Sequence, residues 1–171
     1  MLLAPLPASL GEGTAASPRL VVETWLAVPL AGPRAGPLAG RARTFSVLML
    51  KRAALHGGFW QGVSGRVERF DASLAAAALR EIREETGLNE GVEILDLGRW
   101  IEFESPFSGM TFRKRSLGAV LPAATTAASV ALSEEHDEAR LVTFDQARTL
   151  VRFPENVEEL SALESRLAAA P

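Results

Sequence analysis

SLAAAALREIREETGL, residues 73–88, predicts a short amphipathic helix that collects three carboxylates on one face. At about 100° per residue, Glu81, Glu84 and Glu85 fall within roughly one third of the helical circumference. A different arc carries the side chains expected to pack against the rest of the protein, namely Ala75, Ala78, Leu79, Ile82 and Thr86. One face of the helix is therefore expected to pack, and the other to hold negative charge.

Carboxylates that lie close together repel one another, so this acidic face favours a cation among its side chains. Hard divalent ions such as Mg²⁺ and Mn²⁺ prefer oxygen ligands of this kind. A solvated helix face, with Arg80 and Glu84 paired four residues apart, would produce the same local pattern. The choice between a metal site and a solvated face therefore depends on the segment that precedes the helix.

That preceding segment, residues 58–68 (GFWQGVSGRVE), is a loop punctuated by glycines. Together the loop and the helix resemble the Nudix box, G-x5-E-x7-R-E-U-x-E-E-x-G-U, in which U is a bulky aliphatic residue. The matching positions are Gly65, Arg80, Glu81, Ile82, Glu84, Glu85, Gly87 and Leu88. The chain is thus identified as similar to the Nudix (MutT-like) hydrolases. F-W-Q before the box and E-H after it look most similar to bacterial nucleoside triphosphate and dihydroneopterin triphosphate pyrophosphohydrolases.

The chain departs from the family pattern at one place. Fourteen residues, 66–79, separate Gly65 from Arg80, where the family pattern has thirteen. Counted back from Arg80, the first glutamate of the pattern falls on Ala72, and Asp71 supplies a carboxylate there only if the loop bulges. In the family this glutamate usually supports the loop and the helix, whereas the later glutamates hold the metal.

The resemblance implies an α/β fold, a Nudix-type α/β/α sandwich with a mixed central sheet. We expect a single domain at residues 19–171, behind a mobile N-terminal tail at residues 1–18. By resemblance, Glu84 and Glu85 would bind Mg²⁺ or Mn²⁺ with help from Glu81, and Arg80 would orient these carboxylates.

The resemblance also implies a reaction, in which water cleaves a phosphoanhydride bond with the help of a divalent ion. A nucleoside triphosphate or a pterin triphosphate is the leading substrate, giving pyrophosphate and a monophosphate. A dinucleoside polyphosphate or a nucleotide sugar is the alternative, although the tyrosine usual in diadenosine polyphosphate enzymes is absent because the chain has no tyrosine. The departure at Ala72 adds another alternative, a degenerate domain that binds nucleotide without turnover.

A second acidic segment, Ser133–Glu138 (SEEHDE), lies downstream of the box. Nudix proteins often take an extra metal ligand, or the base for water, from outside the box, and E-H-x-E before a short strand recurs among them. Glu135 is the preferred candidate, followed by Glu138 and Glu134; a charged surface turn would give the same pattern. His136 is a weaker candidate for a general base, because a mechanism with carboxylates and metal does not require an imidazole.

Candidates for contacts with the substrate come from predicted strands and loops. Arg113 and Arg115 alternate along a strand and so share a face, where they would either meet phosphates or protect an exposed edge. Trp60, Phe103 and Phe107 are candidates for stacking on the base, and packing in the core is the alternative for each.

Composition narrows the class of protein. A chain of 171 residues with 47% hydrophobic residues can bury one core of ordinary domain size. A net charge of −3 gives no basic footprint for a nucleic-acid polymer, so the expected partner is a small molecule, with a homodimer left open. The absence of cysteine excludes disulfides and thiolate sites. No apolar stretch approaches the roughly 20 residues that cross a membrane, and the sequence predicts a soluble, cytoplasmic protein.

The rest of the chain predicts strands before and after the box, followed by helices at the end. The predicted strands are residues 19–30, 44–50, 92–103, 111–121 and 141–144. The predicted helices after the box are residues 145–153, with Asp145 as the N-cap, and residues 154 to about 168. Ser73 is expected to cap the box helix and Gly87 to end it.

Overall fold

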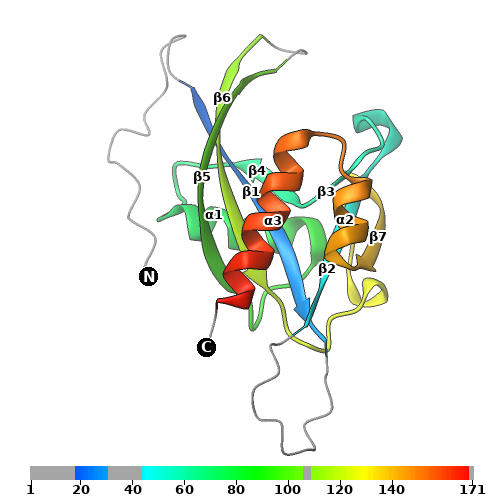
Figure 1. The fold of residues 1–171 in the computed structure, drawn as a ribbon. Helices are drawn as coiled ribbons and strands as arrows, with labels where there is room; N and C mark the ends of the chain where they lie inside the picture. The colour runs from blue at the N-terminus through cyan, green and yellow to red at the C-terminus, as the bar shows by residue number, and fades with distance from the viewer. Residues whose placement is uncertain (1–17, 31–43, 106–108, 170–171) are drawn as a thin grey trace, which may run out of the picture.

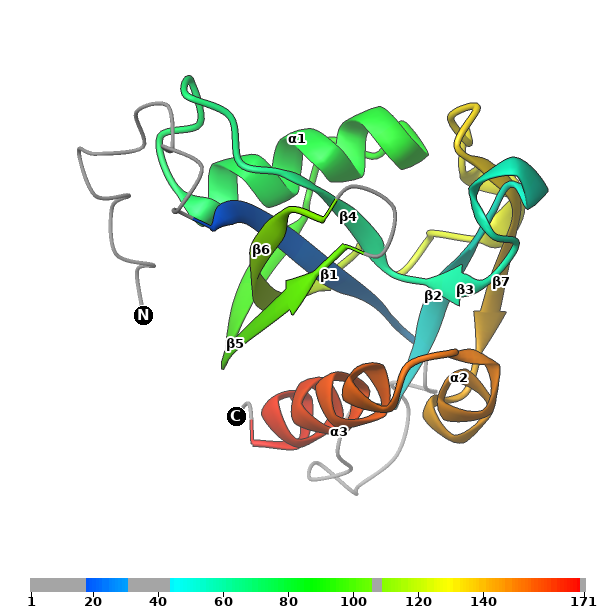
Figure 2. The ribbon, with the colours of Figure 1, turned by 90° about the horizontal axis from the view of Figure 1, so that it is seen from above.

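The computed structural model describes residues 18–30, 44–105 and 109–169, so nearly all of the expected tail, and also Phe107, lie outside the described residues. A seven-stranded mixed sheet lies between α1 on one face and α2 and α3 on the other (Figures 1 and 2). The strands are β1 (Arg19–Pro29), β2 (Phe45–Arg52), β3 (Trp60–Gln61), β4 (Val63–Arg66), β5 (Glu93–Glu104), β6 (Thr111–Val120) and β7 (His136–Val142). The helices are α1 (Leu74–Thr86), α2 (Phe144–Leu150) and α3 (Pro154–Ala168). The predicted α/β sandwich is confirmed.

The sheet has the order β3-β2-β1-β6-β5, with β4 paired to β1 and β7 paired to β2. Strands β1 and β6 are parallel, and the other pairs are antiparallel. Short 3₁₀ helices at Ala54–His56 and Ala127–Ser129 interrupt the connections. The predicted hairpin of β5 and β6 is present, with a bulge between Asp96 and Arg99.

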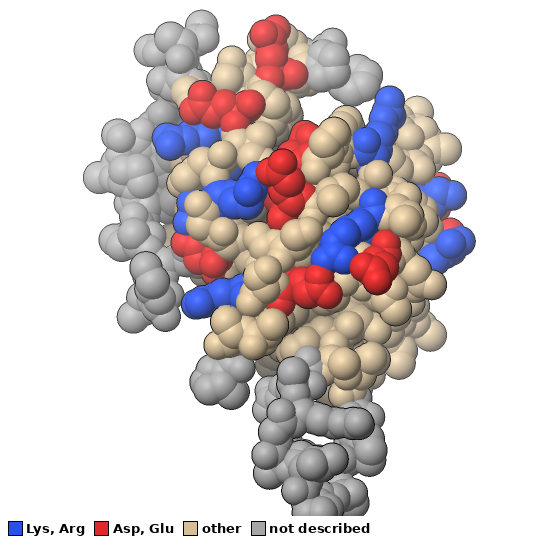
Figure 3. All heavy atoms as spheres, viewed as in Figure 1, with Lys and Arg blue, Asp and Glu red and all other residues tan. Residues whose placement is uncertain are grey.

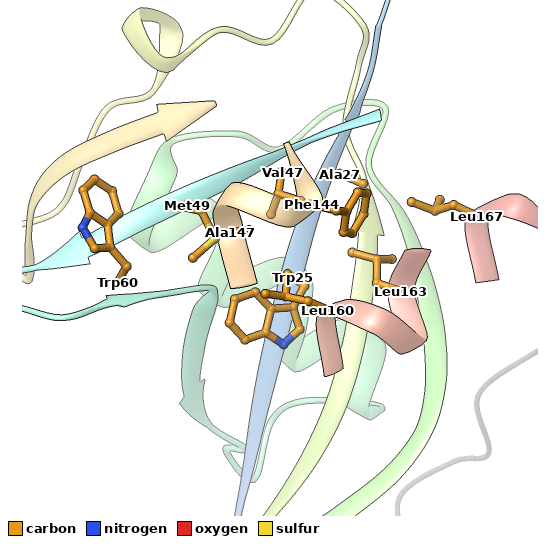
Figure 4. Packing of buried hydrophobic residues seen from close by; sticks show 10 residues of the cluster. All are labelled: Trp25, Ala27, Val47, Met49, Trp60, Phe144, Ala147, Leu160, Leu163 and Leu167. Atoms are coloured by element: carbon orange, nitrogen blue, oxygen red, sulfur yellow. The ribbon is translucent and has the colours of Figure 1, made fainter. Parts of the chain in front are cut away.

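Alternate side chains of β1 serve two cores, one on each face of the sheet. Val22 and Leu26 pack under α1, whereas Trp25 and Ala27 pack under α2 and α3. Figure 4 shows ten residues of the second core, with Trp25 beside Leu160 of α3. Because both faces of β1 are buried, this strand reads as a nearly continuous apolar run.

Helix α1 begins and ends where the sequence predicts. The Ser73 hydroxyl accepts a hydrogen bond from the Ala76 N–H at 3.1 Å, and Gly87 adopts the left-handed φ of 73° that ends the helix. The predicted packing arc was wrong in part, because Leu79 is 39% exposed and Ala75 is only half-buried. The buried face of α1 is rotated relative to the predicted one, because β4 runs beside the helix and Glu85 belongs to the buried face.

Two segments differ from the predicted elements. Strand β7 starts at His136, well before the predicted residue 141, because it pairs along β2 from its first residue. The N-cap of α2 is Thr143 and not Asp145: its hydroxyl accepts from the Gln146 N–H, while the Gln146 side chain accepts from the Thr143 N–H. The loop before the box contains the short strands β3 and β4.

No helix in the described part of the chain is long and apolar enough to span a membrane.

Candidate functional site

The three carboxylates of α1 lie at different depths. Glu85 is only 4% exposed, Glu81 is mostly buried, and the side chain of Glu84 is 51% exposed. A Cβ atom on residue 65 would lie 1.9 Å from Glu81 Cδ, so a larger residue would displace the Glu81 carboxylate from its place beside β4. The glycine of the box thus makes room for the first of its helical carboxylates.

Arg80 joins the loop to the acidic face of the helix. Its Nε and Nη2 donate to the two oxygens of Asp71 at 3.1 and 2.9 Å, and its Nη1 donates to Glu81 at 2.7 Å and Glu84 at 3.1 Å. Nη2 also donates to the carbonyl oxygen of Arg66 at 2.8 Å. The bidentate pair between Arg80 and Asp71 is directional as well as strong, so Arg80 fixes where the carboxylates lie.

The loop does bulge, and it places Asp71 rather than Ala72 against Arg80. Asp71 is buried and Ala72 is exposed. Burial alone would raise the pKa of Asp71, but hydrogen bonds from Arg80 and from the Glu68 N–H outweigh burial and hold that pKa below its ordinary value. The extra loop residue therefore leaves a charged carboxylate facing the arginine.

Glu85 is the least solvated carboxylate of the cluster. Its Oε1 accepts from the Ser64 N–H at 3.3 Å, whereas its Oε2 is buried without a hydrogen bond from any described residue. Burial, together with the charges of Glu81 and Glu135, raises the pKa of Glu85 to about 8. Burial likewise raises the pKa of Glu81, against the effect of Arg80. A buried carboxylate with an unpartnered oxygen and acidic neighbours is suited to bind a cation.

Glu135 lies directly before β7. Its carbonyl oxygen accepts from the Ala53 N–H at 2.8 Å, and its carboxylate pairs with Arg52 at 3.0 Å. The Ser133 N–H donates to the carbonyl oxygen of Glu85 at 3.2 Å, so the downstream acidic segment lies beside the end of the box helix, and the charge of Glu135 raises the pKa of Glu85. Of the two alternatives, Glu138 pairs with Arg140, and Glu134 is exposed like Glu135.

The donor set fits a hard divalent ion in its chemistry. Among the described residues, no group of three His, Asp or Glu side chains is arranged to hold a metal ion, and the Arg80 guanidinium takes oxygens of Glu81 and Glu84. Carboxylate oxygens are nevertheless the ligands that Mg²⁺ and Mn²⁺ prefer, and Glu85 Oε2 has none of its hydrogen-bonding capacity used.

The two arginines predicted to meet phosphates have acidic partners of their own. Arg115 pairs with both oxygens of Asp96, and Arg113 lies 3.6 Å from Glu102. Both guanidinium groups also lie over the Trp100 ring, at 4.6 Å for Arg113 and 5.0 Å for Arg115. They belong to one face of the β5–β6 hairpin, where these contacts hold them.

The aromatic candidates lie in two different environments. Trp60 is buried in the core beneath α2 and α3 (Figure 4), and the Arg140 guanidinium lies 4.8 Å from its ring centroid. Phe103 is 42% exposed and stacks on Phe112 with ring centroids 5.5 Å apart. Trp60 thus takes the packing role that was its alternative, and Phe103 keeps a partly free face.

Sequence reasoning missed Arg52 and gave Asp71 only a conditional role. Arg52 ends β2, where a basic residue looks like an ordinary strand terminus, and its partner Glu135 lies 83 positions away. No local pattern links the two, since the pairing of β2 with β7 brings them together. On the face that carries α2 and α3, acidic and basic side chains are interspersed, without a continuous basic surface (Figure 3).

Comparison with known proteins identifies the fold. A family model described as NUDIX domain matches residues 35–163. The structure is similar to an Ap4A hydrolase from C. elegans, with 19% identity, coverage of 89% of this chain and 99% of that chain, and a TM-score of 0.71. It is similar to the dihydroneopterin triphosphate pyrophosphohydrolase of E. coli, with 21% identity, 83% and 92% coverage, and a TM-score of 0.61. A Nudix hydrolase from M. smegmatis gives 19% identity, 90% and 88% coverage, and a TM-score of 0.63.

A curated relative shares a short segment with this chain. It is an octanoyltransferase from Myxococcus xanthus, 47% identical over 58 residues, which are 34% of this chain. The matched segment spans 15% of the length of that relative.

Proposed function

This chain belongs to the Nudix family, and from that premise we propose that it hydrolyses a nucleoside triphosphate or a related triphosphate, such as a pterin triphosphate. Nudix enzymes hydrolyse phosphoanhydrides and generally use divalent cations, and the chain is accordingly a hydrolase acting on acid anhydrides. The proposed products are pyrophosphate and a monophosphate. The observation that carries the proposal is the buried carboxylate of Glu85 on the box helix, with one oxygen unpartnered and with the charges of Glu81 and Glu135 raising its pKa.

Each acidic residue has a proposed role that follows from its position. Glu84 and Glu85, with Glu81, would hold Mg²⁺ or Mn²⁺ through carboxylate oxygens. The ion, when bound, would neutralise phosphate charge and lower the pKa of bound water. Arg80, fixed by the buried Asp71, would keep Glu81 and Glu84 in place without touching the substrate.

Glu135 would complete the site from the opposite side, either as a further ligand or as the acceptor of the proton from the attacking water. Its carboxylate is half exposed and its backbone is fixed by Ala53, so it meets solvent while its position is set. Arg52 pairs with Glu135 and its charge lowers the pKa of Glu85, so it offsets part of the repulsion between the two carboxylates.

Two alternative functions have observations behind them. The likeness to an Ap4A hydrolase over nearly the whole of that chain favours a dinucleoside polyphosphate, and a nucleotide sugar belongs to the same alternative. The departure at Ala72 prompted a degenerate domain that binds nucleotide without turnover. The contact of Asp71 with Arg80 supports an enzyme over this last alternative, because the carboxylate that steadies the box is present.

The test is a panel of nucleoside triphosphates, pterin triphosphate, diadenosine polyphosphates and nucleotide sugars, each with Mg²⁺ or with Mn²⁺. Products are identified by chromatography, and pyrophosphate with a monophosphate indicates cleavage between the α and β phosphates. Glu84→Gln and Glu85→Gln serve as matched controls, because each keeps the shape of the side chain and removes a charged ligand. Wild-type rates in both variants would contradict the proposed metal site, and binding without any product would favour the degenerate domain.

A further inference from the structure

Three buried polar side chains from three elements meet behind the acidic face of α1. His136 Nε2 lies 3.5 Å from Glu85 Oε2 and 3.5 Å from Gln61 Nε2. The His136 side chain has no exposed surface, and Gln61 is also buried. The cluster therefore lies inside the protein.

The hydrogen-bonding capacity of this cluster is largely unused by the rest of the protein. Among the described residues, Glu85 Oε2 and His136 Nδ1 are both buried without a hydrogen-bond partner. A neutral imidazole carries one N–H, on either of its two nitrogens. With the proton on Nε2, the ring offers a donor to Glu85 Oε2, and the Gln61 amide N–H beside it has no acceptor there. With the proton on Nδ1, Nε2 accepts from Gln61 instead, and the buried Nδ1–H and Glu85 Oε2 are both left unpaired. An unpaired carboxylate oxygen costs more than an unpaired neutral amide N–H, so the tautomer with the proton on Nε2 is favoured.

An apolar side chain of similar size would pack at position 136 without this cost. A buried imidazole is therefore explained better by its contact with Glu85 than by packing alone. The distance of 3.5 Å is at the outer limit of a hydrogen bond. Hydrogen bonds from an N–H to a carboxylate are about 2.7–2.9 Å long, so a short shift of the ring toward Oε2 completes the contact.

We infer that His136 is a positioning residue, which holds Glu85 Oε2 through its Nε2–H and so orients that carboxylate for a divalent cation. Gln61 lies against the same nitrogen and limits where the ring can move. The His136 side chain has no exposed surface, which favours the support of Glu85 over a role as general base. The inference rests on the proposed function, since it assigns to His136 the support of a proposed metal ligand. Such supporting contacts typically change metal affinity by about 10- to 100-fold.

The test measures Mn²⁺ binding to the full chain without substrate, by electron paramagnetic resonance or calorimetry at one pH. His136→Leu removes the donor and keeps most of the volume, so we expect the Kd for Mn²⁺ to rise about 10- to 100-fold. His136→Gln can place an N–H near the position of Nε2, and its Kd is expected to stay within about 3-fold of wild type. Glu85→Gln should lose most of the binding, because it removes the ligand itself.

The outcomes separate the two proposals. If wild type fails to bind Mn²⁺, or if Glu85→Gln binds as well as wild type, the metal site of the proposed function is wrong. If wild type binds, Glu85→Gln does not, and His136→Leu matches wild type, only the role of His136 is overturned. Equal losses in His136→Leu and His136→Gln would also overturn it, because they would reflect packing. Should His136→Leu fail to fold in a thermal scan, His136→Asn replaces it, since its shorter amide places no donor at Glu85.

Discussion

Replacing Glu85 with glutamine is expected to stabilise the metal-free protein at neutral and alkaline pH. Glutamine keeps the shape of the side chain but cannot ionise. In wild type, burial and the nearby charges of Glu81 and Glu135 raise the pKa of Glu85 from 4.5 to about 8. The folded state then retains a proton that the unfolded chain has already released, so the free energy of unfolding falls as pH rises between these two values.

The expected size follows from the shift in pKa. One pKa unit corresponds to about 1.4 kcal/mol, so the cost of keeping Glu85 folded is about 3 kcal/mol at pH 7 and approaches about 5 kcal/mol above pH 8. At pH 4.5 the cost nearly vanishes, because half of the unfolded chains are still protonated at this position. Glu85→Gln should therefore exceed wild type in stability by an amount that grows with pH.

Urea unfolding followed by tryptophan fluorescence, with EDTA present, measures this difference at pH 5, 6, 7 and 8. Glu84→Gln is the matched control, because it removes a carboxylate from the same helix at a position that is 51% exposed. The control should follow the wild-type curve. A difference between Glu85→Gln and wild type that does not change with pH, or a Glu85→Gln protein less stable than wild type at pH 8, would refute the reasoning.

Three further predictions concern the same site. Mg²⁺ or Mn²⁺ should raise the melting temperature, and the rise should be larger at pH 8 than at pH 6, because binding requires Glu85 to lose its proton. Calorimetry that finds an equal rise at both pH values would contradict this prediction. Asp71→Asn should lower the free energy of unfolding in urea by about 3 kcal/mol, because Arg80 loses a buried charged partner. A decrease under about 0.5 kcal/mol would show that the pair is dispensable. Glu135→Gln should lower kcat by about 10²- to 10⁴-fold with a smaller effect on KM, while Glu134→Gln stays near wild type. If Glu135→Gln turns over normally, the base or extra ligand lies elsewhere.

The sequence by itself determined the box helix and its chemistry. Ser73, Gly87 and the three glutamates lie within one local stretch, and capping, periodicity and charge density are local properties. The residue pattern of the box also carried the family resemblance, and with it the expected sandwich. Helix α3 could also be predicted from the sequence, because Pro154 marks its first turn and the apolar spacing continues to its end.

The tertiary structure decided which residues meet across the sheet. The pairing of β2 with β7 brings Arg52 to Glu135, and the path of β4 beside α1 buries Glu85. These contacts join segments far apart in the chain, and strand register is set by the packing of whole faces rather than by neighbours in sequence. Burial likewise could not be predicted from residue type, so the sequence did not decide whether Trp60 stacks on a base or packs in the core.

The loop before the helix shows the same division on a smaller scale. From the spacing alone, the first carboxylate of the box could be absent, with Ala72 at its position, or displaced by one residue to Asp71. The bulge is settled by the five donors of Arg80, which are satisfied together by Asp71, by the helical carboxylates and by the carbonyl of Arg66. Sequence therefore determined which chemistry the site contains, and the satisfaction of buried charges in three dimensions decided which residue supplies each part of it.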